Sequence, residues 1–194
     1  HRSGHSFPTR RSSDLIEKLF NKLFTKFSKF KIQNEKFPKI TFADAMLKYG
    51  TDKPDLRNPL LIYEVSDVFK RDDVKFDIFK NLVNKGNVVR AIIAPQTSDK
   101  PRSFFDNIDK WSKDQGASGL AYFTLEQKSD LSAKGPIGKF FSSDSLKEII
   151  KITGAKVKDT IFFSCGSKKE VENILSLARN KIAEELKLIN YNQF

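Results

Sequence analysis

Residues 49–57 read Tyr49-Gly50-Thr51-Asp52-Lys53-Pro54-Asp55-Leu56-Arg57. The stretch combines a glycine that can end a helix, a proline that fixes φ, and four charged side chains. A buried core would not tolerate these charges, and a plain linker would not need them. We therefore expect a stiff, exposed turn that joins two parts of the fold.

The segment just upstream extends this pattern. Residues 37–46 read Phe37-Pro38-Lys39-Ile40-Thr41-Phe42-Ala43-Asp44-Ala45-Met46. The Phe37-Pro38 step predicts extended backbone, because the residue before a proline avoids the helical region. Thr41 and Asp44 predict the start of a short helix, and Gly50 predicts its end.

Together the two runs resemble the bacterial type of aspartyl-tRNA synthetase, a class II enzyme. They match the point where that family's chain leaves the catalytic sheet, after the second class II motif, and enters an inserted domain. The resemblance runs from about Phe37 to Leu188. It includes Phe162-Phe163-Ser164, which resembles the closing unit of the inserted domain, a domain known also from a subunit of tRNA-dependent amidotransferases.

A second segment carries the same resemblance. Residues 135–140 read Gly135-Pro136-Ile137-Gly138-Lys139-Phe140, similar to a family segment of the form small–Pro–apolar–x–Lys–Phe. The alternative is a phosphate-binding loop, but this spacing fits no P-loop and no helix follows directly.

The resemblance implies a division of the chain into four parts. We expect residues 16–58 to be a segment of the class II catalytic domain, 59–181 the insertion domain, and 182–194 the return toward the catalytic domain. Residues 1–15 contain a string that resembles one translated frame of a short-read sequencing adapter, so we expect an artefact there and leave it out of the fold. The alternative is a basic N-terminal tail.

The periodicity of apolar residues predicts strands interleaved with helices, several of them joined by short links. This favours an α+β fold, a mainly antiparallel sheet with packed helices, preceded by a helical entry segment. Ser167 and Glu170 predict a capping box, and Ser103 with Asp106 predicts another helix start. The predicted strands are 88–94, 120–125 and 160–163, with 60–65 as a strand or the start of a helical turn; the helices are 16–30, 103–116, 143–154 and 167–186; the loops are 96–100 and 129–138.

The helix at 16–30 has a stripe of apolar residues opposite a lysine-rich face. We expect the stripe to pack on a part of the protein outside this sequence. A partner or a membrane surface is the alternative.

The composition limits the chemistry. The chain is 39% hydrophobic, enough for a core, and its formal net charge is +11; residues 1–15 hold three arginines and one aspartate, which leaves +9. This charge suits RNA or DNA, although lysine is also abundant in chains encoded by AT-rich genomes. Both histidines lie in residues 1–15 and Cys165 is the only cysteine, so Cys-His, Ser-His-Asp and Cys/His zinc sites are excluded elsewhere.

The same composition bears on location. One cysteine permits no internal disulfide, which fits a reducing cytoplasm. No stretch has the form of a secretory signal, and none approaches the roughly 18 apolar residues of a membrane helix.

The resemblance implies a parent enzyme, an aspartate–tRNA ligase, of which this chain is a fragment. The parent would use ATP and Mg to activate aspartate and would transfer it to tRNA for aspartate, and in one class of members also for asparagine. It would be a cytoplasmic homodimer. The arginine of the second class II motif and the glycine-rich third motif are absent here, so we assign no catalytic residue and no metal site, and expect the fragment alone to be inactive.

Asp52, Lys53, Asp55 and Arg57 are the candidate contacts with the active-site mouth or with tRNA, because Lys53 and Arg57 can meet phosphate as a point charge and a planar fork. A local network that pairs Asp52 or Asp55 with Arg57 is the alternative. For the whole chain, the alternatives are a free-standing RNA-binding or tRNA amidotransferase-associated module and a generic basic interaction protein.

Overall fold

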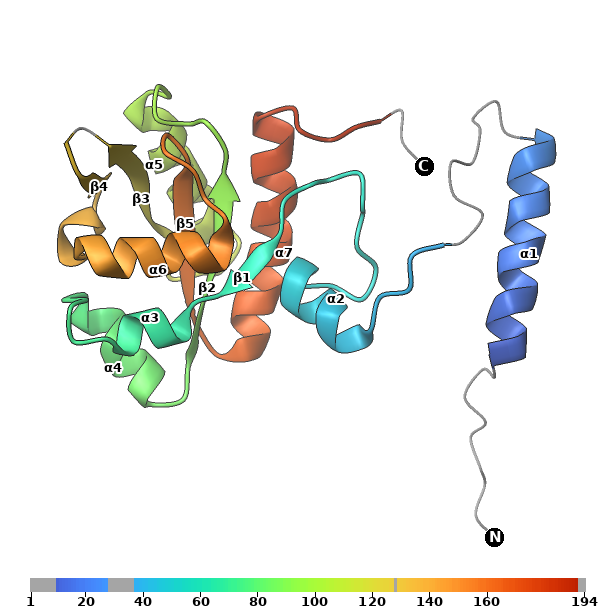
Figure 1. Cartoon of the computed structure of the whole chain (residues 1–194), viewed down its shortest axis with the longest axis horizontal. Coiled ribbons are helices and arrows are strands. Elements are labelled where there is room, and N and C mark those ends of the chain that lie inside the picture. Colours follow the sequence, from blue (N-terminus) through green and yellow to red (C-terminus); the bar gives the residue numbers. More distant parts are fainter. Residues whose placement is uncertain (1–9, 28–36, 128, 192–194) are drawn as a thin grey trace, which may run out of the picture. The chain divides into compact units, whose positions relative to one another are not determined.

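The computed structural model describes residues 10–27, 37–127 and 129–191. The chain divides into two units, one formed by residues 1–40 and 191–194 and the other by residues 41–190. The strands of the described part all lie in the second unit (Figure 1).

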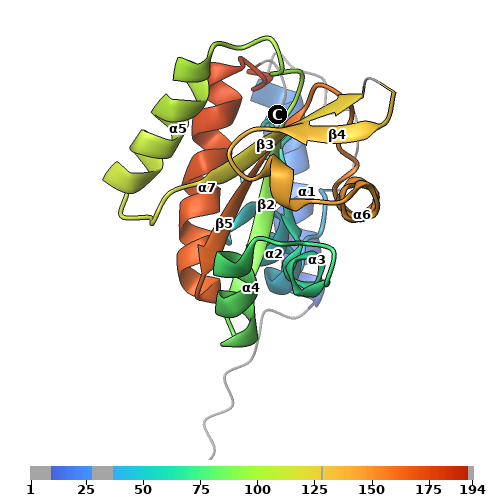
Figure 2. The same ribbon diagram turned by 90° about the vertical axis from the view of Figure 1, so that its left-hand side faces the viewer.

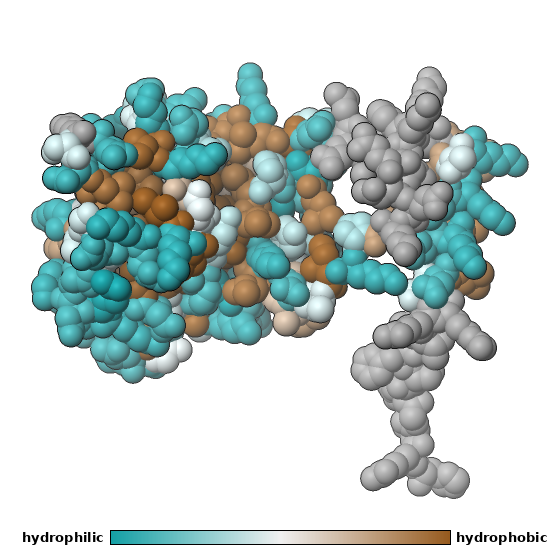
Figure 3. All heavy atoms as spheres, viewed as in Figure 1, coloured by the Kyte–Doolittle hydropathy of each residue, from teal (hydrophilic) through white to brown (hydrophobic). Residues whose placement is uncertain are grey.

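The first unit contains α1 (Arg10–Phe27). The amphipathic helix is present as predicted, and its apolar stripe is exposed in this chain; Figure 3 shows brown apolar patches between its teal charged side chains. The helix starts at Arg10 and not at Ile16, so it begins within the segment expected to be an artefact. The predicted end of the helix at Phe30 lies outside the described residues. The exposed members of the stripe are Leu15, Ile16, Leu19, Phe20, Leu23 and Phe27.

The second unit is built on a five-stranded sheet whose order is β1-β2-β5-β3-β4. Every pairing is antiparallel, with Ala91 opposite Phe163 and Phe123 opposite Ile161 as examples of the register. The predicted α+β class and antiparallel sheet are confirmed. The strands are β1 (Ile62–Glu64), β2 (Val88–Ala94), β3 (Ala121–Gln127), β4 (Leu131–Lys134) and β5 (Thr160–Gly166).

Helices cover both faces of this sheet. Successive residues of a strand point to opposite faces, and in β5 Ile161 and Phe163 enter one core while Phe162 enters the other. The first core is closed by α3 (Ser66–Lys70), α4 (Asp77–Asn84) and α6 (Ser143–Thr153). The second is closed by α5 (Arg102–Asp114) and α7 (Lys168–Glu185); Figure 2 shows α5 and α7 on one side of the sheet and α3 and α6 on the other.

The helix ends follow their predicted caps in three cases. Thr41 caps α2 (Phe42–Tyr49) and Gly50 ends it in the left-handed region. Gly154 ends α6 in the same way. Ser167 and Glu170 form the predicted capping box at the start of α7.

The predicted start of α5 is wrong. Its N-cap is Pro101, which makes no side-chain cap, and Ser103 lies inside the helix. Pro101 has φ −65° and extended ψ, so the chain can enter the helix directly after it without a hydroxyl cap.

The loop predicted at 129–138 contains the strand β4, which pairs with β3 from Thr124 to Gln127. Only Leu131 and Ala133 are half-buried in this strand, alternating with exposed Ser132 and Lys134. Two apolar residues are too short a pattern to predict a strand, and the hydrogen-bonding edge of β3 decides the conformation. The loop predicted at 96–100 is a turn, but Thr97 within it is fully buried rather than exposed.

A buried arginine of β2 holds α2 against the sheet. Arg90 is 3% exposed. Its guanidinium donates to Glu64 at 3.0 Å, to Glu172 of α7 at 3.2 Å and to the Met46 carbonyl at 3.4 Å. Two carboxylates therefore compensate the buried charge, and the carbonyl bond ties in the last turn of α2.

Candidate functional site

Residues 50–61, here called the junction loop, connect α2 to β1. The loop begins at Gly50, whose φ is +70° and whose N–H donates to the Met46 carbonyl at 3.2 Å. A Cβ at this position would lie 2.3 Å from the backbone oxygen of Glu172 in α7. Position 50 therefore requires glycine for two reasons, the positive φ angle and the close approach of α2 to α7.

The four predicted site residues form two neighbouring ion pairs in this loop. Lys53 Nζ lies 3.2 Å from Asp52 Oδ2, and the Lys53 side chain is 85% exposed. Arg57 donates through Nε and Nη2 to Asp55 at 3.0 and 2.8 Å, and its backbone N–H also reaches Asp55 Oδ1 at 3.0 Å. The hydrogen bond from Arg57 holds the pKa of Asp55 below its ordinary value.

The geometry contains the pairing that the alternative of a local network predicts. Asp55 pairs with Arg57, while Asp52 pairs with Lys53. These side chains are exposed or partly exposed, so each pair contributes little to stability. The loop thus presents both charges of each pair at its outer surface.

Sequence reasoning missed Arg179 of α7, which supports the loop from beneath. Arg179 is 2% exposed, and its Nε donates to the Leu60 carbonyl at 2.6 Å. Its Nη2 donates to the carbonyls of Asp55 at 2.8 Å and Asn58 at 2.5 Å. The guanidinium carbon lies 4.9 Å from the centre of the Tyr49 ring, a cation–π contact.

Burial lowers the pKa of Arg179, against the opposing effects of Tyr49 and Asp55. The guanidinium nonetheless stays protonated, as arginine does in proteins. A sequence signal for this residue does exist. Arg179 lies four residues after Leu175 and three before Ile182, both buried, which places a charge on the core face of α7.

Asn58 joins the loop to α7 in the reverse direction. The residue is 2% exposed, and its Nδ2 donates to the Arg179 carbonyl at 3.0 Å. Its Oδ1 accepts from the Leu60 N–H at 3.0 Å. Buried amides need such partners, so Asn58 and Arg179 form a reciprocal contact between loop and helix.

The segment after α7 returns to the same loop. The Asn190 N–H donates to the Arg57 carbonyl at 3.3 Å. The chain therefore leaves the second unit beside the junction loop. With the expected division of the chain, the start of the insertion domain lies close to the segment that follows it, which suits a domain inserted into another fold.

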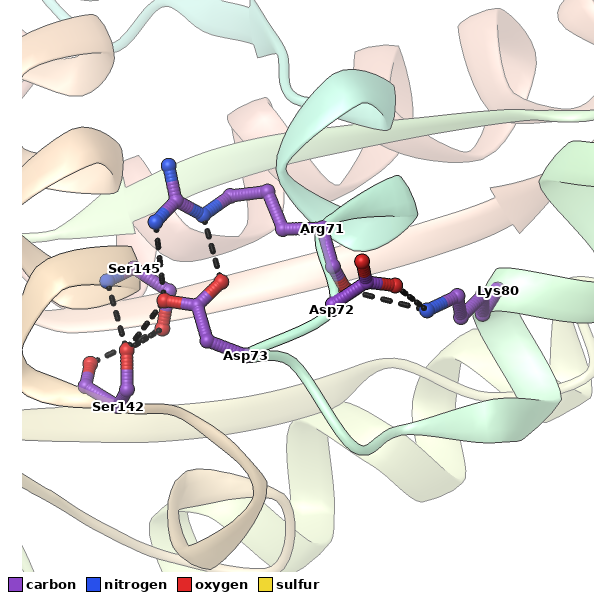
Figure 4. A network of polar contacts seen from close by, with 6 residues as sticks. All are labelled: Arg71, Asp72, Asp73, Lys80, Ser142 and Ser145. Atoms are coloured by element: carbon purple, nitrogen blue, oxygen red, sulfur yellow. Dashed lines mark hydrogen bonds and ion pairs between the residues drawn. The ribbon is translucent and has the colours of Figure 1, made fainter.

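A second polar cluster lies away from the junction loop, where the turn after α3 meets the start of α6 (Figure 4). Arg71 donates through Nε and Nη2 to the two Asp73 oxygens at 2.7 and 2.9 Å. Ser142, the N-cap of α6, donates to Asp73 at 2.5 Å and accepts from the Ser145 N–H at 3.0 Å. Arg71 first, and then Ser142, hold the pKa of Asp73 far below its ordinary value.

This cluster has a structural role in the described part of the chain. The bridge between Val74 and Phe141 lies directly beside it, and the Lys75 N–H donates to the Phe140 carbonyl at 2.9 Å. Lys80 adds a bond to the Arg71 carbonyl and one to Asp72, each at 3.2 Å. The turn after α3 is thereby fastened to α6.

Other chemistry is sparse among residues 10–27, 37–127 and 129–191. No group of three or more His, Cys, Asp or Glu side chains there is arranged to hold a metal ion. Cys165 is half-buried in β5, and burial raises the pKa of its thiol to about 11. The thiol therefore stays protonated near neutral pH and is a poor nucleophile. No helix of the described chain is both long and apolar enough to span a membrane.

Comparison with known proteins gives a consistent picture. A family model described as the GAD domain matches residues 79–175, half of the chain. The "Aspartate--tRNA(Asp/Asn) ligase" of Pelagibacter ubique is 61% identical over 180 residues, which are 93% of this chain and 30% of that protein.

Two further ligases of the same description match over similar lengths. The protein of Methylorubrum populi is 43% identical over 92% of this chain and 30% of its own length. The protein of Wolbachia pipientis wMel is 45% identical over 93% of this chain and 29% of its own length. The chain thus spans about 30% of the length of these curated relatives.

Proposed function

Because the chain belongs to the GAD domain family, we propose that it is the insertion domain, with its entry segment, of an aspartate–tRNA ligase. The alignment with the Pelagibacter ubique ligase carries this proposal. It covers 180 residues, more than the 150 residues at positions 41–190, so it extends beyond the second unit as well as beyond the GAD match. A free-standing module would not require similarity to a ligase outside the module.

The parent enzyme would activate aspartate with ATP and transfer it to tRNA in protein biosynthesis in the cytoplasm. Magnesium would neutralise the phosphate charge during activation. The catalytic motifs, the anticodon-binding region and the dimer interface of that enzyme would be supplied by residues outside this sequence. On this proposal the present fragment binds and positions, and performs no chemistry.

The full-length gene product tests the proposal. We expect aspartate-dependent exchange of pyrophosphate into ATP, followed by charging of a tRNA transcript for aspartate. A transcript for asparagine tests the wider specificity. The 194-residue chain alone serves as the control and should give no exchange. Absence of aspartate-dependent exchange in the full-length protein would refute the assignment.

The reading frame beyond Phe194 separates this proposal from the module alternative. We expect it to continue into the glycine-rich third motif of class II synthetases. A stop codon directly after Phe194 in the genome would favour a free-standing RNA-binding or amidotransferase-associated module.

We further propose that the junction loop contacts the tRNA backbone beside the active-site mouth. Overall charge gives limited support, since residues 41–190 contain 25 Lys and Arg against 21 Asp and Glu, whereas residues 16–40 contain seven Lys against two Glu. The argument therefore depends on particular side chains. Lys53 is the more accessible of the two candidate cations, because its side chain is 85% exposed and that of Arg57 is 42% exposed. An ion pair at such an exposed position can exchange readily for a contact with phosphate.

Lys53→Ala in the full-length enzyme tests this contact. We expect weaker tRNA binding and a salt slope of log K reduced by about 1, with pyrophosphate exchange unchanged. Lys134→Ala is the matched control, because Lys134 on β4 is 77% exposed and lies 3.9 Å from its acidic partner Glu126. Equal effects of the two variants would argue against a specific contact, and a loss of pyrophosphate exchange in Lys53→Ala alone would move the contact from tRNA to the active-site mouth.

A further inference from the structure

Arg179 differs from the other buried arginine of the second unit in what compensates its charge. Arg90 lies against two carboxylates. In the described part of the chain, the hydrogen-bond acceptors of Arg179 are all main-chain carbonyls. A buried cation whose acceptors are backbone oxygens fixes a main-chain conformation, because each bond holds an atom of the chain itself.

The three carbonyls belong to residues 55, 58 and 60, so one side chain holds the second half of the junction loop at three points. The loop also has bonds of its own: the Arg57 N–H donates to Asp55 Oδ1 and the Leu60 N–H donates to Asn58 Oδ1, each at 3.0 Å. Two further bonds are longer. The Lys53 N–H lies 3.3 Å from Thr51 Oγ1, and the Asn58 N–H lies 3.4 Å from the Asp55 carbonyl. The loop is therefore held by its own contacts together with α7, and Arg179 supplies three of the bonds from that helix.

The position of the Asp55–Arg57 pair follows from this arrangement. Asp55 carries one of the carbonyls that Arg179 binds, and Arg57 directly precedes Asn58, which carries another. The direction of both side chains thus depends on where Arg179 holds the backbone. The three bonds from Arg179 to the loop carbonyls are here called the clamp. Asn58 strengthens the clamp, because its side chain donates to the Arg179 carbonyl.

We propose that Arg179 is a positioning residue, which sets the junction loop in the conformation that meets tRNA and so couples the insertion domain to the reaction of the parent enzyme. The inference rests on the proposed function of the loop. Arg179 itself lies beneath the loop and is 2% exposed. It therefore acts through the residues that it holds and not by touching substrate.

Hydrogen exchange of the 194-residue chain tests the physical step, independently of any activity. In Arg179→Lys, an ammonium replaces the planar fork and cannot reach three carbonyls in the same geometry. We expect amides of residues 51–61 to exchange about tenfold faster, the factor that corresponds to one lost hydrogen bond. Arg179→Met should give a larger effect.

Arg90→Met is the matched control, because Arg90 is equally buried, contacts the same helix α7 through Glu172 and has no hydrogen-bond partner among residues 50–61. In Arg90→Met, amide hydrogen exchange should become faster near α2 and stay unchanged in the junction loop. Equal loosening of the loop in the Arg179 and Arg90 variants would overturn the clamp. If Arg179→Met fails to fold, Arg179→Lys decides.

The full-length enzyme tests the coupling, assayed below the unfolding temperature of each variant. In Arg179→Lys we expect kcat/KM for tRNA to fall about tenfold, mainly through KM, with aspartate-dependent pyrophosphate exchange unchanged. Arg90→Met should change neither. A purely structural role for Arg179 would lower both activities together through loss of folded enzyme.

The outcomes separate the two proposals. If the wild-type enzyme charges no tRNA, the proposed function fails, whatever the exchange data show for the clamp. If the wild-type enzyme charges tRNA and Arg179→Lys loosens the loop without changing KM for tRNA, the positioning role fails while the proposed function stands.

Discussion

Gly50 and Gly154 end two helices with the same φ of +70°, but their surroundings differ. The position of a Cβ at Gly50 is 2.3 Å from the Glu172 backbone oxygen, whereas a Cβ at Gly154 meets nothing within 4 Å. The two residues therefore separate the cost of a left-handed dihedral from the cost of a collision. They also report how closely α2 approaches α7.

We predict that Gly154→Ala lowers the free energy of unfolding by about 1 kcal/mol, the cost of a left-handed alanine. Gly50→Ala should cost about 2 kcal/mol more, because a backbone atom must also move. Urea denaturation of the 194-residue chain measures both. Equal losses for the two variants would contradict the close contact between α2 and α7.

The two buried arginines, Arg90 and Arg179, show how much of a single residue's role can be predicted from the sequence. Arg90 lies on the same sheet face as Val88 and Ile92 in a central strand, and Arg179 shares a helix face with Leu175 and Ile182. Both positions break an apolar pattern, and that break is the available signal. Its meaning depends on partners such as Glu172 and the Leu60 carbonyl, which no local pattern identifies.

Helix starts can be compared element by element. The capping box of α7 satisfies two backbone N–H groups, whereas Ser103 in α5 caps nothing. A side-chain oxygen stabilises a helix start when it accepts from one of the first N–H groups, which have no partner within the helix, and Ser103, the second residue of α5, makes no such bond.

Ser167→Ala should therefore lower the free energy of unfolding by about 1 kcal/mol. Ser103→Ala should change it by less than about 0.5 kcal/mol, because Ser103 is exposed and its hydroxyl caps no backbone N–H. Thermal and urea denaturation of the two variants measure the difference. A larger loss of stability in Ser103→Ala than in Ser167→Ala would instead support Ser103 as the residue that caps α5.

The connection between the turn after α3 and α6 depends on pH through Asp73. Its folded-state pKa is held below the unfolded value by Arg71 and Ser142. The stabilisation is thus present in full above the unfolded pKa of about 4 and is lost as pH falls through the lower folded value.

We predict that Asp73→Asn is less stable than the wild type at pH 7, and that the difference shrinks as pH falls below about 4. Asp72→Asn is the control, because the Asp72 side chain is fully exposed and its pair with Lys80 should contribute little to stability. Urea denaturation at a series of pH values gives both curves. A difference between Asp73→Asn and wild type that stays constant from pH 7 to pH 3 would contradict the ion pair.

The elements also show which parts of the fold can be read locally. Strands β2 and β5 have long β-branched or aromatic runs, and α2, α6 and α7 have capping residues within one turn of their ends. Strand β4 has two half-buried residues and exists because β3 offers a free edge. Local pattern predicts the first group well and the second group poorly.

At the scale of the whole molecule, residues 41–190 form a compact unit with two cores of their own. Such a unit is large enough to fold without additional segments. The candidate site lies in the junction loop, beside the segment by which the chain leaves the unit, where the Asn190 N–H donates to the Arg57 carbonyl.

We predict that a chain starting at Lys39 has the same unfolding temperature as the 194-residue chain. A chain starting at Gly50 should unfold several degrees lower, since it loses buried Ala45 and the Met46 carbonyl that Arg90 binds, and about 1 kcal/mol corresponds to 2–4 °C at this size. Differential scanning calorimetry measures both. A large loss on removing residues 1–38 would show that the second unit depends on the first.

From the residues alone came the antiparallel α+β class, most helix ends, the likeness to a synthetase insertion and the charged loop that carries the candidate site. Those features depend on alternation, on caps and on short motifs, each contained within a few neighbouring residues. The support of that loop came from the folded chain, because Arg179 binds carbonyls 119 to 124 residues away in sequence. Partners so distant are brought together by packing around the two cores, and that packing is a property of the complete fold.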